Sequence, residues 1–335
     1  MKNLLISILI PFKNTETYLD ACLNSILAQT YTHWELIIVD DASTDSSYDI
    51  VKAFAEKDDR IKLLKTSGRG IIDALKMAFS HSKGELITRM DSDDIMEPNK
   101  LEVLAENLLS YGKQHVAIGL VNYFSETGVQ DGYKSYEIWL NNLTKTGTNY
   151  SEIYKECVIP SPCWMVYRSD LIACDAFNPN TYPEDYDLAF RFYKHRYKCI
   201  PCNAVVHNWR DYSSRTSRTH VHYAENNFLD IKLNYFLELD YSPNKNLVVW
   251  GAGSKGKTIA KKLIKKSIPF DWICDNPNKI GHNIYGKIMK PLSFLETLKK
   301  PQSIITVANK KEQKTIRVFM DDLEMKAGED YYFFC

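Results

Sequence analysis

The sequence lacks three features that would each have placed the protein in a distinct class. No run of about 18 apolar residues occurs, so no membrane span is predicted. Basic and acidic residues number 42 each, so no net charge favours nucleic acid as a partner. The eight cysteines follow no regular spacing, which favours reduced thiols in a cytoplasmic protein. The remaining composition, 44% hydrophobic and 25% charged, is typical of a soluble globular protein.

One pair of cysteines needs separate weighing. Cys199 and Cys202 have histidines nearby, at positions 195 and 207, and four such side chains could bind zinc. However, the segment CIPCNAVVHNW has the pattern of a strand, which would direct these side chains to both faces of a sheet. We therefore favour a structural strand over a zinc site or a redox motif.

The length of 335 residues suggests about two domains. Apolar strand patterns at 4–11, 34–40, 61–64 and 86–90 alternate with helical stripes, which predicts an α/β domain with a largely parallel sheet. A strand at 161–169 and helices at 182–197 and 224–239 follow. The turn-rich segment YSPNKN at 241–246 is predicted to be a linker between domains at 1–240 and 247–335. The polar stretch 125–149 has weak periodicity and is interpreted as an excursion or lid near the site.

The second domain restarts with its own strand and glycine motif. Gly251, Gly253 and Gly256 match G-x-G-x-x-G before a helix predicted at 257–266, and strands are predicted at 270–274 and 303–308. Asp275 lies close to the expected position of a ribose-binding carboxylate. This small Rossmann-like domain could carry NAD chemistry, bind a nucleotide or nucleotide sugar, or serve a structural or homo-oligomerisation role.

The densest group of carboxylates lies in ELITRMDSDDIMEP, residues 85–98. A buried strand pattern ends there in Asp91, Asp93 and Asp94, and such charges are costly unless they are solvated, paired or bound to a cation. In an extended segment Asp91 and Asp93 point to the same side, so they could share one ligand. Hard oxygen ligands suit Mg²⁺ or Mn²⁺ carrying a phosphate-bearing substrate. The alternative is an acidic turn that caps the helix starting near Asn99.

Further polar residues follow other predicted strands. Asp40 and Asp41 end the second strand, where a carboxylate can accept a hydrogen bond from a uracil ring or a ribose hydroxyl. Arg69, between two glycines and just before a helix, is available for phosphate. Glu184 and Asp185 start a later helix, where an ionised general base is stabilised. The alternative for that pair is helix capping by acidic residues.

Taken together, these segments resemble glycosyltransferase family 2. The resemblance rests on SILIPFKNTETYLDACLNSILAQTYTHWELIIVDDASTD, GRGIIDALKMAFSHSKGELITRMDSDDIMEP, PEDYDLAFR and WRDYSSRTSRT, within roughly residues 5–220. It implies a GT-A fold, in which a mixed sheet is flanked by helices, and an inverting transfer from a nucleotide sugar with Mn²⁺ or Mg²⁺.

The resemblance also implies roles for individual residues. Pro11 and Asp41 would hold the nucleobase, and Asp91-Ser92-Asp93 would be the D-x-D motif with Asp93 as principal metal ligand. Asp185 would be the base, with Glu184 beside it. A late loop that closes on the diphosphate would contain Trp209, Arg210, Ser217 and Arg218, and His207 or His220 would complete the metal shell.

The sequence differs from some members of this family, and the differences limit which reactions we expect. The Q-x-x-R-W signature of processive synthases is absent, which favours addition of a single sugar to a glycan or lipid-linked acceptor, with a UDP-sugar as the favoured donor. We expect a cytoplasmic protein, or one at the inner face of the membrane. A nucleotide-sugar-binding regulator without transfer activity is the alternative. A nucleotidyltransferase is disfavoured because PFKNTET after the first strand supplies no Gly- and Arg/Lys-rich phosphate loop.

Overall fold

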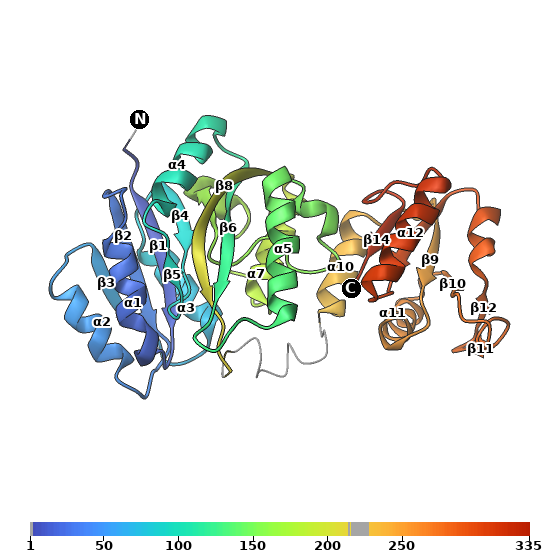
Figure 1. Ribbon diagram of the computed structural model, residues 1–335, viewed down its shortest axis with the longest axis horizontal. Coiled ribbons are helices and arrows are strands. Elements are labelled where there is room, and N and C mark those ends of the chain that lie inside the picture. The colour runs from blue at the N-terminus through green and yellow to red at the C-terminus, as the bar shows by residue number, and fades with distance from the viewer. Residues whose placement is uncertain (1–2, 214, 216–227) are drawn as a thin grey trace. The chain divides into compact units, whose positions relative to one another are not determined.

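Figure 1 shows the computed structural model of the protein, which describes residues 3–213, 215 and 228–335. Its contacts group into two compact units. The first consists of residues 1–149 and 158–215, and the second of residues 150–157 and 216–335. The predicted domain boundary at 241–246 rests on the turn-rich sequence and stays a prediction, while the contacts place helix α10 (Leu229–Leu239) in the second unit.

The first unit is built on a mixed sheet of eight strands in the order β3-β2-β1-β4-β7-β6-β8-β5. Strands β3, β2, β1 and β4 are parallel, β7 runs antiparallel to its neighbours β4 and β6, and β8 is parallel to β6. The strands span Ile6–Phe12 (β1), Trp34–Asp40 (β2), Ile61–Lys65 (β3), Leu86–Arg89 (β4), Ile95–Met96 (β5), His115–Phe124 (β6), Trp164–Tyr167 (β7) and Lys198–Arg210 (β8).

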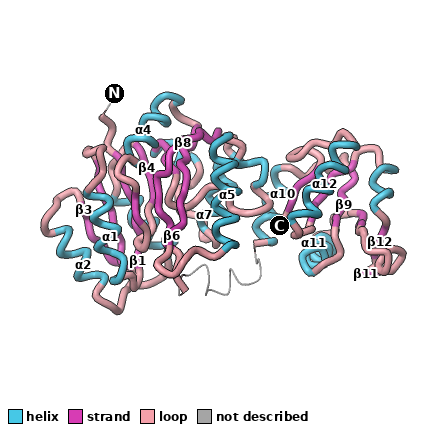
Figure 2. Tube along the Cα trace, viewed as in Figure 1, coloured by secondary structure: helices cyan, strands magenta, loops and turns pink. Residues whose placement is uncertain are grey.

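Burial explains the apolar runs that the sequence shows. Every residue of β1 and of β2 is buried, because helices cover both faces of this part of the sheet (Figure 2). The helices are α1 (Glu16–Leu27), α2 (Ser47–Ala55), α3 (Ile71–His81), α4 (Lys100–Tyr111), α5 (Asp131–Thr146), α6 (Arg168–Ala173) and α7 (Glu184–Lys194). The sequence predicts a helical stripe of Leu19, Cys22, Leu23, Ile26 and Leu27 in α1; the first four are buried as expected, whereas Leu27 is 36% exposed at the end of the helix. The predicted α/β class is therefore confirmed.

Helix α5 occupies most of the stretch that we expected to be a polar excursion, so that expectation is wrong. Strand β6 pairs with β7 only at Ala117 and Ile118. Further along, the Asn141 side chain accepts a hydrogen bond from Val121 N at 3.0 Å and donates one to Val121 O at 2.8 Å. Glu137 accepts a hydrogen bond from Tyr123 N at 2.7 Å. Because polar side chains attach this helix to the strand, its apolar periodicity is weak.

The second unit has a six-stranded sheet in the order β11-β12-β10-β9-β13-β14, with all pairs parallel except β11–β12. The predicted small α/β sheet is confirmed, with three further strands, β11, β12 and β14, that the sequence did not predict. Its elements are β9 (Asn246–Trp250), α11 (Ser254–Lys265), β10 (Asp271–Ile273), β11 (Asn283–Ile284), β12 (Lys287–Lys290), β13 (Pro301–Ile305), α12 (Lys310–Asp322) and β14 (Tyr331–Phe333). Two 3-10 helices span Asn149–Glu152 (η1) and Leu292–Thr297 (η2).

Two glycines of the G-x-G-x-x-G motif have a packing reason. Gly251 has a φ of 118°, and a Cβ on Gly256 would lie 2.1 Å from the Gly251 carbonyl oxygen. By contrast, a Cβ on Gly253 would meet nothing within 4 Å. The first and third glycines therefore permit close packing of the strand and the helix, while the fold itself does not require the second.

Residues 150–157 are anchored in the second unit. The Tyr154 hydroxyl donates a hydrogen bond to Asp240 at 2.5 Å, and its ring stacks on Phe334 with the centroids 5.4 Å apart. Glu152 forms an ion pair with Arg317 of α12. This short segment thus belongs to the core of a unit whose other residues come much later in the chain.

Candidate active site

The predicted site residues follow the carboxyl ends of three neighbouring parallel strands. Strand β1 lies between β2 and β4, so the loops after these strands leave the sheet at one edge. The Asp41 amide donates a hydrogen bond to Phe12 O at 2.9 Å, which places Asp41 at the end of β1, one residue beyond Pro11. The sheet therefore brings Pro11, Asp41 and the D-x-D segment toward a common region.

The D-x-D segment is a turn and not an extended strand end, so our reason for placing two carboxylates on one side is wrong. Strand β4 ends at Arg89, residues 92 and 93 are in a turn, and Asp94 N donates to Asp91 O at 3.4 Å. Asp91 and Asp93 are both partly exposed, whereas Asp94 is fully buried. The turn, rather than strand alternation, directs Asp91 and Asp93 outward.

Asp94 fixes this turn from the inside. It accepts hydrogen bonds from Arg210 N at 2.7 Å and from the His207 Nε2 group at 3.0 Å. Burial, followed by the charge of Lys100, holds the pKa of His207 well below its usual range, so the ring is neutral. Since His207 is fully buried and its Nε2 faces Asp94, the structure places it behind the turn and not among outward-facing ligands.

Asp93 is held by Arg210, the last residue of β8, and by Tyr212, which follows it. Tyr212 donates its hydroxyl to Asp93 Oδ2 at 2.8 Å, and Arg210 Nε donates to the Asp93 carbonyl at 2.8 Å. Burial, together with the neighbouring Asp94 and Asp91 carboxylates, raises the pKa of Asp93 to about 7. This part of the site therefore holds more negative charge than its surroundings compensate.

This charge excess fits a divalent cation. In the part of the chain that the structure describes, no cluster of three or more His, Cys, Asp or Glu side chains is arranged to bind a metal. Two outward carboxylates, Asp91 and Asp93, are present, and Mg²⁺ typically binds through one or two carboxylates plus substrate phosphates and water. The donor set thus suits a cation that arrives with its phosphate-bearing substrate.

Two arginines lie beside the turn. The Arg210 guanidinium stands over the rings of Tyr18, at 4.8 Å, and Phe124, at 4.6 Å. Arg215 is buried, stands 4.9 Å from the Trp209 ring centroid, and is close enough to Asp94 and Asp93 to lower the pKa of each. The sequence reading selected Arg210 but neither Arg215 nor Tyr212. The predicted residues Ser217, Arg218 and His220 lie outside the described residues.

Arg89 connects the D-x-D segment to the predicted base. Its Nη1 donates to Glu184 Oε1 at 2.8 Å and its Nη2 donates to Asp91 Oδ1 at 3.1 Å, while only 4% of the residue is exposed. The sequence reading missed Arg89 because it treated β4 as an apolar strand. The available signal was a charged residue inside that run, two positions before Asp91.

Asp185 lies in the first turn of α7, which begins at Glu184 as predicted. Burial, followed by the charge of Glu184, raises the pKa of Asp185 to about 7, and the Arg89 cation opposes that rise. Asp185 Oδ1 accepts a hydrogen bond from Tyr186 N at 2.8 Å. Among the residues that the structure describes, Asp185 forms no ion pair, so no salt bridge prevents its carboxylate from accepting a proton. A carboxylate with a pKa near neutrality is suited to general base chemistry.

The residues at the end of β2 have different environments. Asp41 accepts hydrogen bonds from the Thr66 hydroxyl at 2.8 Å and from Gly70 N at 3.1 Å, which ties it to the loop that contains Arg69. Asp40 is fully buried, accepts a hydrogen bond from Ser43 N at 2.8 Å and pairs with Lys65 at 3.5 Å. Both carboxylates are thus buried: Asp41 is hydrogen-bonded to the loop that contains Arg69, and Asp40 stabilises the turn after β2.

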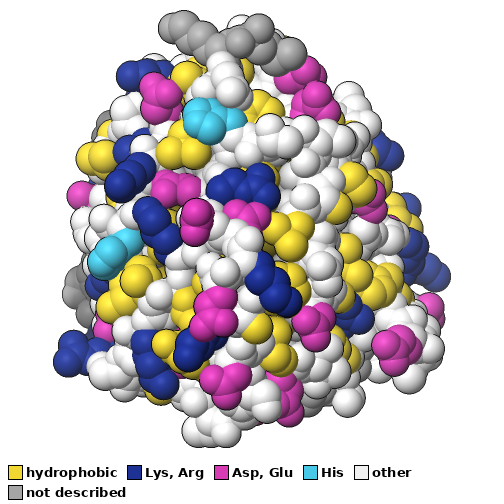
Figure 3. All heavy atoms as spheres, turned by 90° about the vertical axis from the view of Figure 1, so that its left-hand side faces the viewer, with side chains coloured by type: hydrophobic (Ala, Val, Ile, Leu, Met, Phe, Trp, Pro, Cys, Tyr) yellow, Lys and Arg dark blue, Asp and Glu magenta, His cyan; other side chains and the backbone are white. Residues whose placement is uncertain are grey.

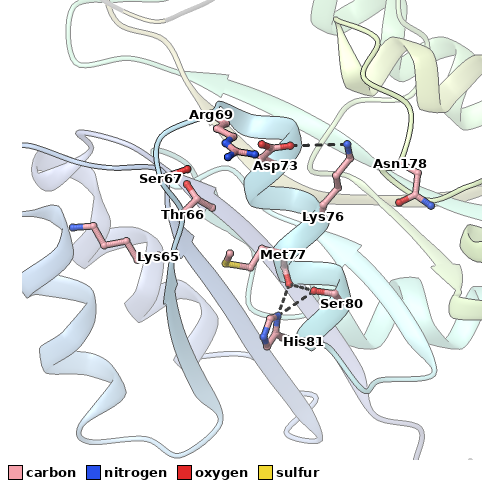
Figure 4. Close-up of a pocket in the computed structure, with 10 residues that line it drawn as sticks. All are labelled: Lys65, Thr66, Ser67, Arg69, Asp73, Lys76, Met77, Ser80, His81 and Asn178. Carbon is pink, nitrogen blue, oxygen red and sulfur yellow. Dashed lines mark hydrogen bonds and ion pairs between the residues drawn. The ribbon is translucent and has the colours of Figure 1, made fainter.

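Arg69 lies on an open groove of about 510 Å³ between the end of β3 and helix α3 (Figure 4). Its side chain is exposed and is drawn close to Asp73, which pairs with Lys76 at 3.9 Å. The groove is lined by Lys65, Thr66, Ser67, Arg69, Asp73, Lys76, Met77, Ser80, His81 and Asn178. The loop around Arg69 therefore joins this groove to the Asp41 side of the site.

Sequence comparison identifies several related transferases. "Glycosyltransferase GlyG" of Streptococcus pneumoniae is 40% identical over 125 residues, which cover 37% of this chain and 42% of that protein. "Glycosyltransferase GlyA" of the same organism is 37% identical over 120 residues, or 36% of this chain and 17% of that protein. The chain thus spans less than half the length of these two relatives. "UDP-Glc:alpha-D-GlcNAc-diphosphoundecaprenol beta-1,3-glucosyltransferase WfgD" of Escherichia coli is 28% identical over 256 residues, covering 73% and 89%.

Structure comparison supports the fold. The structure of Staphylococcus aureus TarS 1–349 in complex with UDP-GlcNAc matches 71% of this chain and 68% of that chain, with a TM-score of 0.54 and 19% sequence identity. At this identity the match shows the fold alone, and it confirms the predicted GT-A architecture.

A family model agrees with both comparisons. The model described as "Glycosyl transferase family 2" matches residues 7–174, about half of the chain. The matched range contains β1 from Ser7 onward, the Asp41 loop and the whole D-x-D turn. The chain belongs to glycosyl transferase family 2.

Proposed function

We propose that the protein transfers a single sugar from a nucleoside-diphosphate sugar, with a UDP-sugar as the favoured donor, to an acceptor hydroxyl with inversion at the anomeric carbon. The observation that carries this proposal is the buried Arg89 bridge, which contacts Asp91 at 3.1 Å and Glu184 at 2.8 Å. Because of this bridge, the acidic turn and the residue next to Asp185 lie within the reach of one guanidinium. Donor activation and acceptor deprotonation need this proximity.

The donor would lie along the carboxyl ends of β1, β2 and β4. Pro11 and Asp41 would hold the nucleobase, with Arg69 on the adjoining loop available for phosphate. Arg210 and Asp91 would complete the donor contacts near the D-x-D turn, and Asp40 would act from below by fixing the loop after β2. The hydrogen bonds of Asp41 to Thr66 and Gly70 support this assignment, because they hold the carboxylate in a fixed position.

Asp93 and Asp91 would hold Mn²⁺ or Mg²⁺, and the bound cation would neutralise the charge that develops on the departing diphosphate. The raised pKa of Asp93 supports this role, since a carboxylate among other carboxylates gains most from a nearby cation. Arg210 and Arg215 add positive charge on the same side of the turn.

Asp185 would take the proton of the acceptor hydroxyl. The acceptor oxygen forms a bond to the anomeric carbon as the bond from that carbon to the diphosphate oxygen breaks, and the nucleoside diphosphate leaves with the bonding pair. Glu184, fixed by Arg89, keeps the first turn of α7 in place and raises the pKa of Asp185 toward the working pH. In this role Glu184 is a positioning residue.

The acceptor class is proposed from the relatives. The name of WfgD describes transfer to a diphosphoundecaprenol-linked sugar, and its match covers most of this chain. We therefore propose a glycan or lipid-linked sugar acceptor, in surface polysaccharide or glycan biosynthesis. No helix in the described ranges has the length and apolar character to cross a membrane.

The test combines donor screening with matched variants. UDP-, GDP- and dTDP-sugars are assayed with the full chain, with and without Mn²⁺, for release of nucleoside diphosphate and for transfer to a sugar acceptor. We expect Asp93→Asn and Asp185→Asn to lose about 10³-fold or more of the transfer rate. Asp49→Asn, an exposed change on α2, should keep the full rate.

Donor binding separates the outcomes. Asp185→Asn should still bind the nucleotide sugar, as measured by thermal shift, because the base does not hold the donor. Full activity in either site variant would refute the assignment. Tight donor binding by the wild type without transfer to any acceptor would favour a nucleotide-sugar-binding regulator instead.

A further inference from the structure

Positive charge in this electrically neutral chain is concentrated in one part of the second unit. Residues 251–290 contain nine lysines and two aspartates, whereas residues 291–335 contain seven basic and seven acidic residues. The side of the first unit that carries β3 and α2 shows basic and acidic side chains interspersed (Figure 3). The excess in residues 251–290 therefore marks a surface of distinct character.

Helix α11 supplies much of this charge and has no acidic residue. Lys261 and Lys265 are one helical turn apart on its exposed side, with Ile264 beside them at 39% exposure. Lys262 lies on another side of the helix, where it forms an ion pair with Asp230 of α10. The exposed stripe of α11 thus combines an apolar side chain with two lysines, Lys261 and Lys265, that form no ion pair with any residue the structure describes.

The β11–β12 hairpin continues this stripe. The Lys261 ammonium lies 4.8 Å from the ring centroid of Tyr285, which is 46% exposed. Ile284 is paired directly with Lys287 across the hairpin, so both side chains point to the same side of the sheet. Lys287 in turn stands 4.9 Å from the Phe270 ring centroid. The Lys261–Tyr285 contact joins the helix to the hairpin, and we call the residues of these two elements the basic–apolar face: Lys261, Ile264, Lys265, Ile284, Tyr285 and Lys287.

We propose that the basic–apolar face binds an anionic membrane surface without crossing it. Lysines near a membrane are attracted by anionic headgroups, and a tyrosine at this level places its ring among the headgroups. Ile264, which is exposed, and Ile284, which is half-buried, gain free energy on binding only where the partner also offers an apolar layer. A nucleic acid or an acidic protein would attract the lysines but would not bury these apolar side chains in an apolar layer. A lipid surface would do both, so it fits the face better.

The test is co-flotation of the full chain with vesicles of phosphatidylcholine, with and without about 30% phosphatidylglycerol, at about 0.15 M salt. We expect binding to the anionic vesicles only. Reversing two charges with Lys261→Glu and Lys265→Glu should weaken binding by roughly thirtyfold or more, from about 1 kcal/mol for each lysine. The matched control is Lys310→Glu with Lys314→Glu on α12, both exposed, which should bind like the wild type.

A second pair of variants tests the apolar part. Tyr285→Ser removes the exposed ring from the face, whereas Ile288→Ser changes a residue of 51% exposure that alternates to the other side of β12 from Lys287. We expect only the first to weaken vesicle binding, and all these variants to transfer sugar normally to a water-soluble acceptor, so this inference and the proposed function fail separately. Equal binding to neutral and anionic vesicles, or equal losses from both lysine pairs, would overturn the proposal. So would binding to a single-stranded RNA as tight as to vesicles.

Discussion

Replacing Arg89 with methionine should destabilise the first unit strongly. The Arg89→Met variant leaves Glu184, whose side chain is 10% exposed, and Asp91, at 21%, without their shared cation. Removing one partner of a buried ion pair costs about 3–5 kcal/mol, and the partial exposure of Asp91 favours the lower end. For a unit of this size, a loss of about 3 kcal/mol corresponds to a fall of roughly 6–12 °C in the midpoint of its thermal transition.

The assay is thermal unfolding of the full chain at about pH 8, followed by fluorescence and calorimetry, without divalent cation. Two further variants make the reasoning specific. Lys52→Met removes a fully surface pair with Glu56, at 4.0 Å, and should change stability by less than about 0.5 kcal/mol. Adding Glu184→Gln to Arg89→Met should recover part of the loss, because one uncompensated carboxylate is removed.

An Arg89→Met midpoint within about 2 °C of the wild type would refute this account of the bridge. It would mean that water or another cation compensates both carboxylates when the guanidinium is absent. The same result would also weaken the argument that Arg89 fixes the relative positions of Asp91 and Glu184.

Three other predictions follow from single features. The transfer rate should fall about tenfold per pH unit below about pH 7. Asp185 faces Glu184, Arg89 and Asp91, must be deprotonated to act as the base, and has a pKa that burial raises to about 7. A pH profile of kcat/KM that is flat between about pH 5 and 8 would contradict this prediction. Gly256→Ala should destabilise the second unit by several kcal/mol, since the added Cβ would lie 2.1 Å from the Gly251 carbonyl oxygen. Gly253→Ala should leave the thermal midpoint unchanged. Equal midpoints for the two variants would show that close packing is not the reason for Gly256. Asn141→Ala should cost about 2 kcal/mol in urea unfolding because it leaves the amide and carbonyl of Val121 without partners, and a cost below about 0.5 kcal/mol would show that water replaces them.

Most of the fold could be predicted from the periodicity of apolar residues and from residues typical of helix and strand ends. The stripe of α1, the start of α7 at Glu184 and the glycine motif before α11 were readable because each depends on local spacing. Helix α5 was not, because its attachment to β6 depends on hydrogen bonds between residues far apart in the sequence. Its polar residues have the composition of a loop, and only the structure shows that they hydrogen-bond to the backbone of β6.

In the candidate site, too, local patterns could be predicted from the sequence, whereas contacts between distant residues could not. The acidic segments were found because carboxylates at strand and helix ends are conspicuous in a sequence. Arg89 and Arg215 were missed because their roles depend on partners about 95 and 120 positions away, and no local pattern reports such pairs. The turn at Ser92 was also missed, since alternation along a strand says nothing about where the strand ends.

The membership of residues 150–157 in the second unit has a consequence for how the chain is made. A ribosome releases this segment well before the residues that surround Tyr154, such as Asp240 and Phe334, have been synthesised. The first unit, whose last residue is at 215, can complete its sheet while this segment still lacks its core partners. A single cut near residue 240 would therefore not separate two independent proteins: it would leave Tyr154 and Phe236 on one fragment and their ring partners Tyr332 and Phe334 on the other.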